Sequence, residues 1–190
     1  MEVEVNKTLD AKGLACPMPI VKTKKEMNTL EPGQVIEIQA TDKGSTADIK
    51  AWAESTGNQY LGTVEEVGIL KHYLRKASAE EEVTENKHPD LISFDELAKK
   101  IEGEEKITVL DVREPAEYGF GHIPGAIHIP LGELEQRFEE LEKTDDIHVI
   151  CRTGRRSDFA AQKLADKGYK NVKNVVPGMQ EWTGPINTNH

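Results

Sequence analysis

The sequence predicts an α/β protein of two domains, and three observations support this prediction. Over residues 1–76, the apolar pattern follows the order β-α-β-α-β-β, which is typical of a two-layer sandwich with both helices on one face of a small sheet. Over residues 89–186, apolar strands alternate with helices, as in a parallel sheet flanked by helices. Residues 77–88 are acidic with few apolar side chains, so we expect a solvated linker between the domains.

The elements of the first domain follow from alternation, caps and breakers. Alternating side chains predict strands, and Pro32-Gly33 and Gly57 mark the ends of two helices. Ser45 is a plausible cap for the second helix. We expect strands over 3–9, 35–40, 59–67 and 69–75, and helices over 17–30 and 45–55.

The second domain is predicted from buried apolar runs with helical segments between and after them. We expect strands over 107–112, 147–150 and 172–176, and helices over 95–101, 131–141, 155–167 and, briefly, 179–182. Residues 187–190 form a polar tail that we expect to be mobile.

Composition excludes several classes of protein. The net charge of −10 argues against a nucleic-acid surface, and no segment approaches the roughly 18 apolar residues of a membrane span. The start of the chain lacks the pattern of a secretory signal, so we expect a cytoplasmic protein without a membrane partner. The second domain is acidic, yet three arginines follow its cysteine, which indicates an anion there unless these side chains are simply solvated.

Two cysteines, Cys16 and Cys151, each precede a predicted helix. A thiol at a helix N-terminus meets unpaired N–H groups and the positive end of the helix dipole, so we expect both to be reactive thiolates. Buried apolar cysteines and a structural disulfide are the alternatives, and the second is disfavoured in a reducing compartment. Neither has a Cys or His at ligand spacing, so no metal is expected, and no other cofactor is implied.

Three segments of the second domain, in order, carry a resemblance. The loop Cys151-Arg-Thr-Gly-Arg-Arg-Ser, together with residues 111–118 and 121–126 upstream, resembles a single-domain rhodanese. A cysteine phosphatase would need an arginine six residues after the nucleophile, where this chain has Ser157. The resemblance implies that Cys151 accepts sulfane sulfur as a persulfide.

The same resemblance implies roles for the neighbours of Cys151. Asp111 and Arg113 would brace the loop, whereas His122, His128 and His148 are expected to be structural. The residues expected to bind an anionic donor such as thiosulfate are Arg152, Thr153, Gly154, Arg155, Arg156 and Ser157.

The first domain carries the motif Cys16-Pro17-Met18-Pro19 after the Lys12-Gly13-Leu14 turn, and it resembles the TusA-type sulfur carriers. This implies that Cys16 carries a persulfide to a partner, with Pro17, Pro19 and Lys12 in supporting roles. Some relatives have a second cysteine on the second helix, where this chain has Ala51-Trp52-Ala53, so we expect one thiol to act alone. Lys22 and Lys25 form either a solvated face or a docking site for an acidic partner.

The whole chain thus resembles a fusion of a TusA-like sulfur carrier with a single-domain rhodanese. The leading interpretation is a sulfurtransferase in which thiosulfate or a low-molecular-weight persulfide charges Cys151, and Cys16 passes the sulfur to a protein thiol acceptor or another sulfur-trafficking protein. The alternative is a persulfide-binding or partner-docking module in which the two domains act independently with little turnover.

Overall fold

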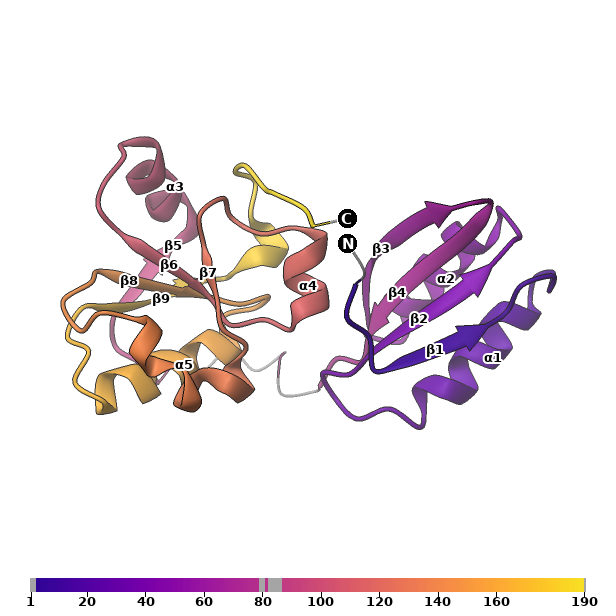
Figure 1. The fold of residues 1–190 in the computed structure, drawn as a ribbon, viewed down its shortest axis with the longest axis horizontal. Coiled ribbons are helices and arrows are strands. Elements are labelled where there is room, and N and C mark those ends of the chain that lie inside the picture. The colour runs from indigo at the N-terminus through magenta and orange to yellow at the C-terminus, as the bar shows by residue number, and fades with distance from the viewer. Residues whose placement is uncertain (1–2, 79–80, 82–86, 190) are drawn as a thin grey trace. The chain divides into compact units, whose positions relative to one another are not determined.

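Two units, divided after Ser78, make up the computed structural model, which describes residues 3–78, 81 and 87–189 (Figure 1). Each is described by itself below. Among the described residues, no helix has the length and apolar character needed to cross a membrane.

The first unit has the predicted order of elements. Its sheet runs β1-β2-β4-β3, with β1 parallel to β2 and the remaining pairs antiparallel. Both helices pack on one face of this sheet, where Ile20, Ile49 and Ile38 belong to one apolar cluster (Figure 1). The elements are β1 (Lys7–Asp10), α1 (Met18–Met27), β2 (Val35–Ala40), α2 (Ser45–Ser55), β3 (Gln59–Glu66) and β4 (Ile69–Arg75).

A buried polar chain fixes the start of α2 against the sheet. Ser45 Oγ donates to the Asp42 carbonyl at 2.5 Å and therefore accepts from His72 Nε2, 2.8 Å away. The other ring nitrogen of His72 lies 2.7 Å from Thr63 Oγ1, which in turn contacts the Tyr60 hydroxyl. Burial lowers the pKa of His72 to about 4, so the imidazole is neutral at physiological pH.

The second unit has a five-stranded sheet in the order β5-β9-β8-β6-β7, in which every pair is parallel, as predicted. Its strands are β5 (Leu91–Ser93), β6 (Thr108–Asp111), β7 (Ile127–His128), β8 (Ile147–Ile150) and β9 (Val172–Val176). Its helices are α3 (Phe94–Glu102), α4 (Pro115–Phe120) and α5 (Arg155–Asp166), with the 3-10 segments η2 (Leu131–Gln136), η3 (Phe138–Glu140) and η4 (Met179–Glu181).

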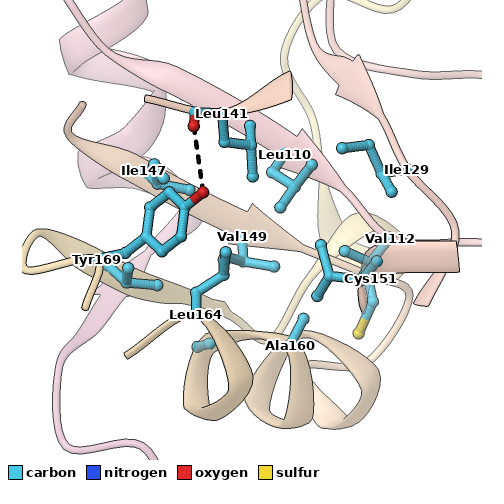
Figure 2. Packing of buried hydrophobic residues seen from close by; sticks show 13 residues of the cluster. Leu110, Val112, Ile129, Leu141, Ile147, Val149, Cys151, Ala160, Leu164 and Tyr169 are labelled. Atoms are coloured by element: carbon cyan, nitrogen blue, oxygen red, sulfur yellow. Dashed lines mark hydrogen bonds between the residues drawn. The ribbon is translucent and has the colours of Figure 1, made fainter. Parts of the chain in front are cut away.

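The core of the second unit lies on both faces of the sheet. Ile147 and Val149 of β8 face the cluster that includes Leu164 of α5 (Figure 2). Ile150 belongs instead to the cluster beneath α3. In Figure 2 the Tyr169 hydroxyl closes one end of the first cluster by donating to the Leu141 carbonyl at 3.2 Å.

Two helices predicted for the second half of the chain need correction, and three short elements were missed. The helix predicted over 131–141 is two 3-10 segments, because Arg137 between them leaves the helical conformation with a φ of −123°. The short helix predicted over 179–182 is the 3-10 turn η4. The elements α4, β5 and β7 were not predicted, since they are only two to six residues long.

The polar tail over 187–190, predicted to be mobile, is hydrogen-bonded to the second unit in its described part. Asn187 exchanges two backbone hydrogen bonds with His122, and the Asn189 N–H donates to the Gly119 carbonyl at 2.8 Å. His190 lies outside the described residues.

The expectation of a solvated linker also fails at two positions. Within 77–88, residues 79–80 and 82–86 lie outside the described part, but Glu81 and His88 are buried. His88 has partners in the second unit, because its Nε2 lies 2.7 Å from the Val172 carbonyl and its N–H donates to Asp158.

Candidate functional site

Cys151 lies in the loop between β8 and α5, where the sequence predicts it. Gly154 opens α5 with a φ of 91°, a left-handed conformation that disfavours a side chain. A Cβ there would also come within 3.1 Å of Val176 Cγ1. This turn brings the Gly154 N–H to the Cys151 sulfur, with the nitrogen 3.1 Å from Sγ. The loop therefore supplies a backbone donor for negative charge on Cys151.

The back of the loop rests against Gly178. A Cβ at Gly178 would lie 2.6 Å from the Cys151 carbonyl oxygen and 2.7 Å from that of Arg152, so only glycine fits. The following N–H groups hold the same carbonyls, with Met179 donating to Cys151 at 2.8 Å and Gln180 donating to Arg152 at 3.1 Å. These contacts fix the orientation of the loop.

The Cys151 thiol is buried beside a hydroxyl and an amide. Its Sγ lies 3.3 Å from Ser157 Oγ, which donates to Asn174 Oδ1 at 2.5 Å. Asn174 in turn donates to the Gly154 carbonyl at 3.1 Å. Because a hydroxyl carries one hydrogen, Ser157 in this arrangement accepts from the thiol S–H. When Cys151 ionises, the same hydroxyl is positioned to rotate and donate to the thiolate.

Arg156 is held by a buried carboxylate. Its two terminal nitrogens donate to Glu117 on α4 at 2.7 and 2.9 Å. Burial opposes its charge, but Glu117, the Cys151 sulfur and Glu81 outweigh that effect and raise the pKa of Arg156. Arg156 therefore keeps a fixed positive charge close to Cys151, with Glu117 compensating much of it.

The other two loop arginines also have partners within the protein. Arg152 Nη1 lies 3.3 Å from a carboxylate oxygen of Glu81. The Arg155 guanidinium lies over the Phe159 ring, 4.7 Å from its centroid. Arg152 and Arg155 thus have partners other than Cys151, and Thr153 of the same loop is half-buried.

Asp111 and Arg113 form a buried ion pair at the end of β6. Arg113 donates to both carboxylate oxygens of Asp111, with the shortest contact at 2.6 Å, and to the Gly121 carbonyl at 2.7 Å. Burial opposes the charge, but Asp111 raises the pKa of Arg113 above its ordinary value. The pair thus braces the turn at Gly121, whereas Glu117 reaches the Cys151 loop directly through Arg156.

The histidines of this unit have structural partners. His122 and His128 stack on the Tyr118 ring at 3.8 and 4.3 Å between centroids, and both hydrogen-bond to backbone carbonyls. His148 is buried on β8, and burial lowers its pKa. These side chains are thus part of the packing and backbone hydrogen bonding of the unit.

Cys16 lies two residues before α1 and is exposed. The expectation of a stabilised thiolate is wrong here, because the Asp48 carboxylate on α2 raises the pKa of Cys16, with smaller contributions from desolvation and from Asp42. The helix terminus offers little compensation. Pro17 and Pro19 have no N–H, and the Met18 N–H donates to the Ala15 carbonyl at 3.0 Å.

Lys12 belongs to the turn that presents Cys16. Its ammonium group donates to Gln39 at 3.2 Å and lies 3.6 Å from Asp10. The Gly13 N–H donates to Thr41 Oγ1 at 2.9 Å. These contacts tie the turn to the end of β2, which agrees with a supporting role for Lys12.

Sequence reasoning missed four residues around Cys151: Glu81, Glu117, Asn174 and Gly178. Only Glu117 carried a signal, because it lies in the segment 111–118 that resembles a rhodanese. The others reach the loop from distant parts of the chain. Within the described ranges, no group of three or more His, Cys, Asp or Glu side chains is arranged to hold a metal ion.

Family models match both halves of the chain. Residues 7–76 match the model described as sulfurtransferase TusA, and residues 93–185 match the rhodanese-like domain. The chain is 55% identical over 176 residues to YrkF of Bacillus subtilis, described as a candidate sulfur carrier protein, with 93% of this chain and 95% of YrkF covered.

Shorter relatives match one half each. The sulfur carrier protein TusA of Allochromatium vinosum is 44% identical over 75 residues, covering 40% of this chain and 97% of that protein. Among solved structures, the rhodanese-like domain of an Anabaena protein is 29% identical with a TM-score of 0.50, covering 53% of this chain and 80% of that one.

The match to YrkF extends through both domains, and the two family models divide the chain in the same order. Both cysteines lie within the matched ranges. The protein therefore belongs to the family in which a TusA-type sulfur carrier domain is joined to a rhodanese-like domain.

Proposed function

We propose that this chain is a sulfurtransferase in which Cys151 accepts sulfane sulfur from thiosulfate or a small persulfide and passes it to Cys16. The observation that carries the proposal is the Gly154 N–H, 3.1 Å from the Cys151 sulfur in a loop that also bears three arginines. Such a loop stabilises both the thiolate and the persulfide anion that replaces it.

The chemistry needs no redox partner. The Cys151 thiolate attacks the outer sulfur of thiosulfate, the sulfur–sulfur bond of the donor breaks, and sulfite leaves with the bonding electrons. A Cys16 thiolate then attacks the outer sulfur of the Cys151 persulfide, and the electron pair of the broken bond returns to Cys151. The Cys16 persulfide is finally attacked by a protein thiol acceptor.

Peptide mass spectrometry of both cysteines after exposure to thiosulfate tests the relay. We compare the wild type with Cys16→Ser and Cys151→Ser. The proposal expects sulfur on Cys16 in the wild type but not in Cys151→Ser, and sulfur on Cys151 in Cys16→Ser. Loading of Cys16 in Cys151→Ser would contradict the relay.

One observation favours a second candidate function, in which the domains act independently. The raised pKa of Cys16 keeps much of this thiol protonated at neutral pH, which slows its attack on any persulfide. In that case a separate partner protein would transfer sulfur to Cys16. Sulfur on Cys151 that never reaches Cys16 in the wild type would favour this candidate.

A further inference from the structure

The hydrogen of the Ser157 hydroxyl has two acceptors within reach. Ser157 is fully buried in the first turn of α5, and its Oγ lies 2.5 Å from Asn174 Oδ1 and 3.3 Å from the Cys151 sulfur. Because a hydroxyl carries a single hydrogen, Ser157 donates either to the amide oxygen or to the sulfur at any one time. The choice between the two acceptors depends on how much negative charge the sulfur carries.

Asn174 is held so that its amide oxygen faces this hydroxyl. The residue is fully buried on β9, and its Nδ2 donates to the Gly154 carbonyl at 3.1 Å. A carbonyl oxygen only accepts, so this bond defines which end of the amide is the donor and turns Oδ1 towards Ser157. The Gly154 nitrogen itself lies 3.1 Å from the Cys151 sulfur. Asn174 therefore contacts both residues that hydrogen-bond to that sulfur.

The charge on the Cys151 sulfur changes during the proposed reaction. In the thiolate, Sγ carries the full negative charge. In the persulfide, the charge lies on the outer sulfur, and Sγ is a neutral, weakly accepting sulfur. A hydroxyl gains much more from a charged acceptor than from a neutral one. The favoured acceptor for the Ser157 hydrogen is therefore Sγ in the thiolate and Asn174 Oδ1 in the persulfide.

We propose that Ser157 is a catalytic residue that stabilises the departing Cys151 sulfur when the persulfide is discharged, and that Asn174 is the positioning residue that holds the Ser157 hydrogen until then. The acceptor thiolate attacks the outer sulfur, the sulfur–sulfur bond breaks, and its electron pair returns to Cys151 Sγ. The hydroxyl turns from Asn174 to that sulfur, and no proton is transferred. This inference rests on the proposed function, because it requires a persulfide on Cys151.

The two half-reactions should respond in opposite directions to loss of the Ser157 hydroxyl. Negative charge builds up on Cys151 Sγ during discharge, so a donor to Sγ stabilises that transition state more than the persulfide. Charge leaves Sγ during charging, so the same donor stabilises the starting thiolate more than the transition state. A purely structural role for Ser157 would instead slow both half-reactions together.

Single-turnover kinetics in a Cys16→Ser background, where Cys151 is the only cysteine, test the inference. The protein is loaded with thiosulfate, freed of donor and mixed with 2-mercaptoethanol, and the remaining persulfide is followed by mass spectrometry. Charging is measured as the sulfite burst at alkaline pH, so that every variant starts from the thiolate. Ser157→Ala should slow discharge about 3- to 10-fold, the range for a hydrogen bond to a charge that is only partly developed. Charging should be no slower.

Substitution of Asn174 should have the opposite effect on discharge. Asn174→Ala removes the amide oxygen and leaves the Ser157 hydrogen to the sulfur, so discharge should be at least as fast as in the parent protein. In a Ser157→Ala background, Asn174→Ala should cause no further change, because the amide acts through the hydroxyl. If Asn174→Ala slows discharge equally with and without Ser157, the role of Asn174 is overturned.

Thr144→Ala is the matched control for loss of a hydroxyl. Thr144 is exposed and precedes β8, whereas Cys151 follows the other end of that strand. Its substitution should leave the rates of charging and discharge unchanged. A change that matches that of Ser157→Ala would show that the effect is not specific to the hydroxyl beside the sulfur, and would overturn the inference.

Infrared spectroscopy tests the same arrangement without turnover. In the resting thiol, Ser157 accepts from the Cys151 S–H because its own hydrogen goes to Asn174. A hydrogen-bonded S–H group stretches at a lower frequency than a free one. The S–H band of the Cys16→Ser protein should therefore move to higher frequency in Ser157→Ala and stay in place in Thr144→Ala. A band that is unchanged in Ser157→Ala would overturn the inference.

The outcomes separate failure of this inference from failure of the proposed function. If Ser157→Ala slows both half-reactions to the same extent, or slows neither, the role of Ser157 is overturned while the persulfide chemistry of Cys151 stands. The proposed function fails instead if thiosulfate leaves no persulfide on Cys151 of the Cys16→Ser protein, in which Ser157 and Asn174 are intact.

Discussion

Cys16 and Cys151 both precede a helix, yet their surroundings have opposite electrostatic effects. Cys151 is buried, with the Gly154 nitrogen 3.1 Å from its sulfur and the charge of Arg156 within electrostatic reach. Cys16 is exposed, and the Asp48 carboxylate raises its pKa. Position at a helix start therefore does not decide the chemistry of a thiol. The groups that neighbouring elements bring to the sulfur decide it.

The two units also use different means to hold those groups. In the first unit, a neutral chain through His72 and Ser45 fixes the start of α2, the helix that carries Asp48. In the second unit, the buried Glu117–Arg156 ion pair ties the first turn of α5 to α4 beside the Cys151 loop. Substitution of a group that holds or surrounds one cysteine should therefore affect the unit that carries it.

The largest expected effect is on the first chemical step. Cys151→Ser should abolish the burst of sulfite that follows mixing with thiosulfate, whereas Cys16→Ser should retain a burst of about one sulfite per chain. The reason is that only Cys151 has the donors that stabilise a thiolate and a persulfide. Rapid-quench measurement of sulfite checks this, and a burst surviving in Cys151→Ser would refute the assignment.

Loss of the buried Glu117–Arg156 ion pair should have the next largest effect, on the stability of the second unit. Glu117→Gln leaves the Arg156 charge buried without its partner, and this should lower the free energy of unfolding of the second unit by about 3–5 kcal/mol. Urea unfolding in a Trp52→Phe background, followed through Trp182 fluorescence, reports on that unit alone.

An exposed ion pair of the same unit provides the control. Glu133 pairs with Arg137 at 2.8 Å, and its side chain is 52% exposed. Glu133→Gln should lower the free energy of unfolding by less than about 1 kcal/mol. Equal effects of the two substitutions would show that the Glu117–Arg156 pair has no special role.

Acid should destabilise the first unit through His72. Its folded-state pKa of about 4 lies below the ordinary value of 6.5, so the unfolded chain binds the proton more readily. The free energy of unfolding should therefore fall as the pH drops from about 6.5 towards 4, by up to about 1.4 kcal/mol per pH unit.

A substitution can show that the pH dependence of the unfolding free energy comes from His72. His72→Gln in a Trp182→Phe background should remove most of the difference in unfolding free energy between pH 7 and pH 5, with Trp52 as the reporter. The lowered carboxylate pKa values of Glu26 and Glu66 contribute only at more acidic pH, below their ordinary value of 4.5. If the unfolding free energy of the wild type did not change between pH 7 and pH 5, the assignment to His72 would be contradicted.

The smallest expected effect concerns Cys16 itself. Asp48→Asn removes the main cause of the raised thiol pKa, so the pH dependence of Cys16 alkylation should shift to lower pH and the rate at pH 7.5 should rise. Iodoacetamide labelling in a Cys151→Ser background measures this. Glu54→Gln, at the other end of α2, should leave the profile unchanged, and a matching shift there would point to a non-specific charge effect.

The fold could be predicted from the sequence wherever apolar periodicity was strong. Apolar periodicity predicts the order of elements along the chain in the first unit and the three central strands of the second unit. The helix predicted over 131–141 was wrong although Leu131, Leu134, Phe138 and Leu141 recur at helical spacing, because Arg137 leaves the helical conformation and the chain forms two 3-10 segments instead.

The site could be predicted only in part, for a physical reason. The loop at Cys151 is local, so its sequence indicates the Gly154 turn and the neighbouring arginines. The groups that modulate both cysteines come from afar: Asp48 is on another helix, and Glu81 and Gly178 reach the Cys151 loop from opposite ends of its unit. Single-sequence patterns do not encode such long-range contacts.

Time-resolved transfer of labelled sulfur tests the central claim most directly, namely that Cys151 accepts sulfur and Cys16 carries it. The protein is mixed with thiosulfate labelled with ³⁴S at the outer sulfur, quenched at intervals and analysed by peptide mass spectrometry. Label should appear first on Cys151, and then on Cys16 as the Cys151 persulfide is replenished from the donor. Label that reaches Cys16 first, or that reaches it in Cys151→Ser, would show that Cys16 does not receive its sulfur from Cys151.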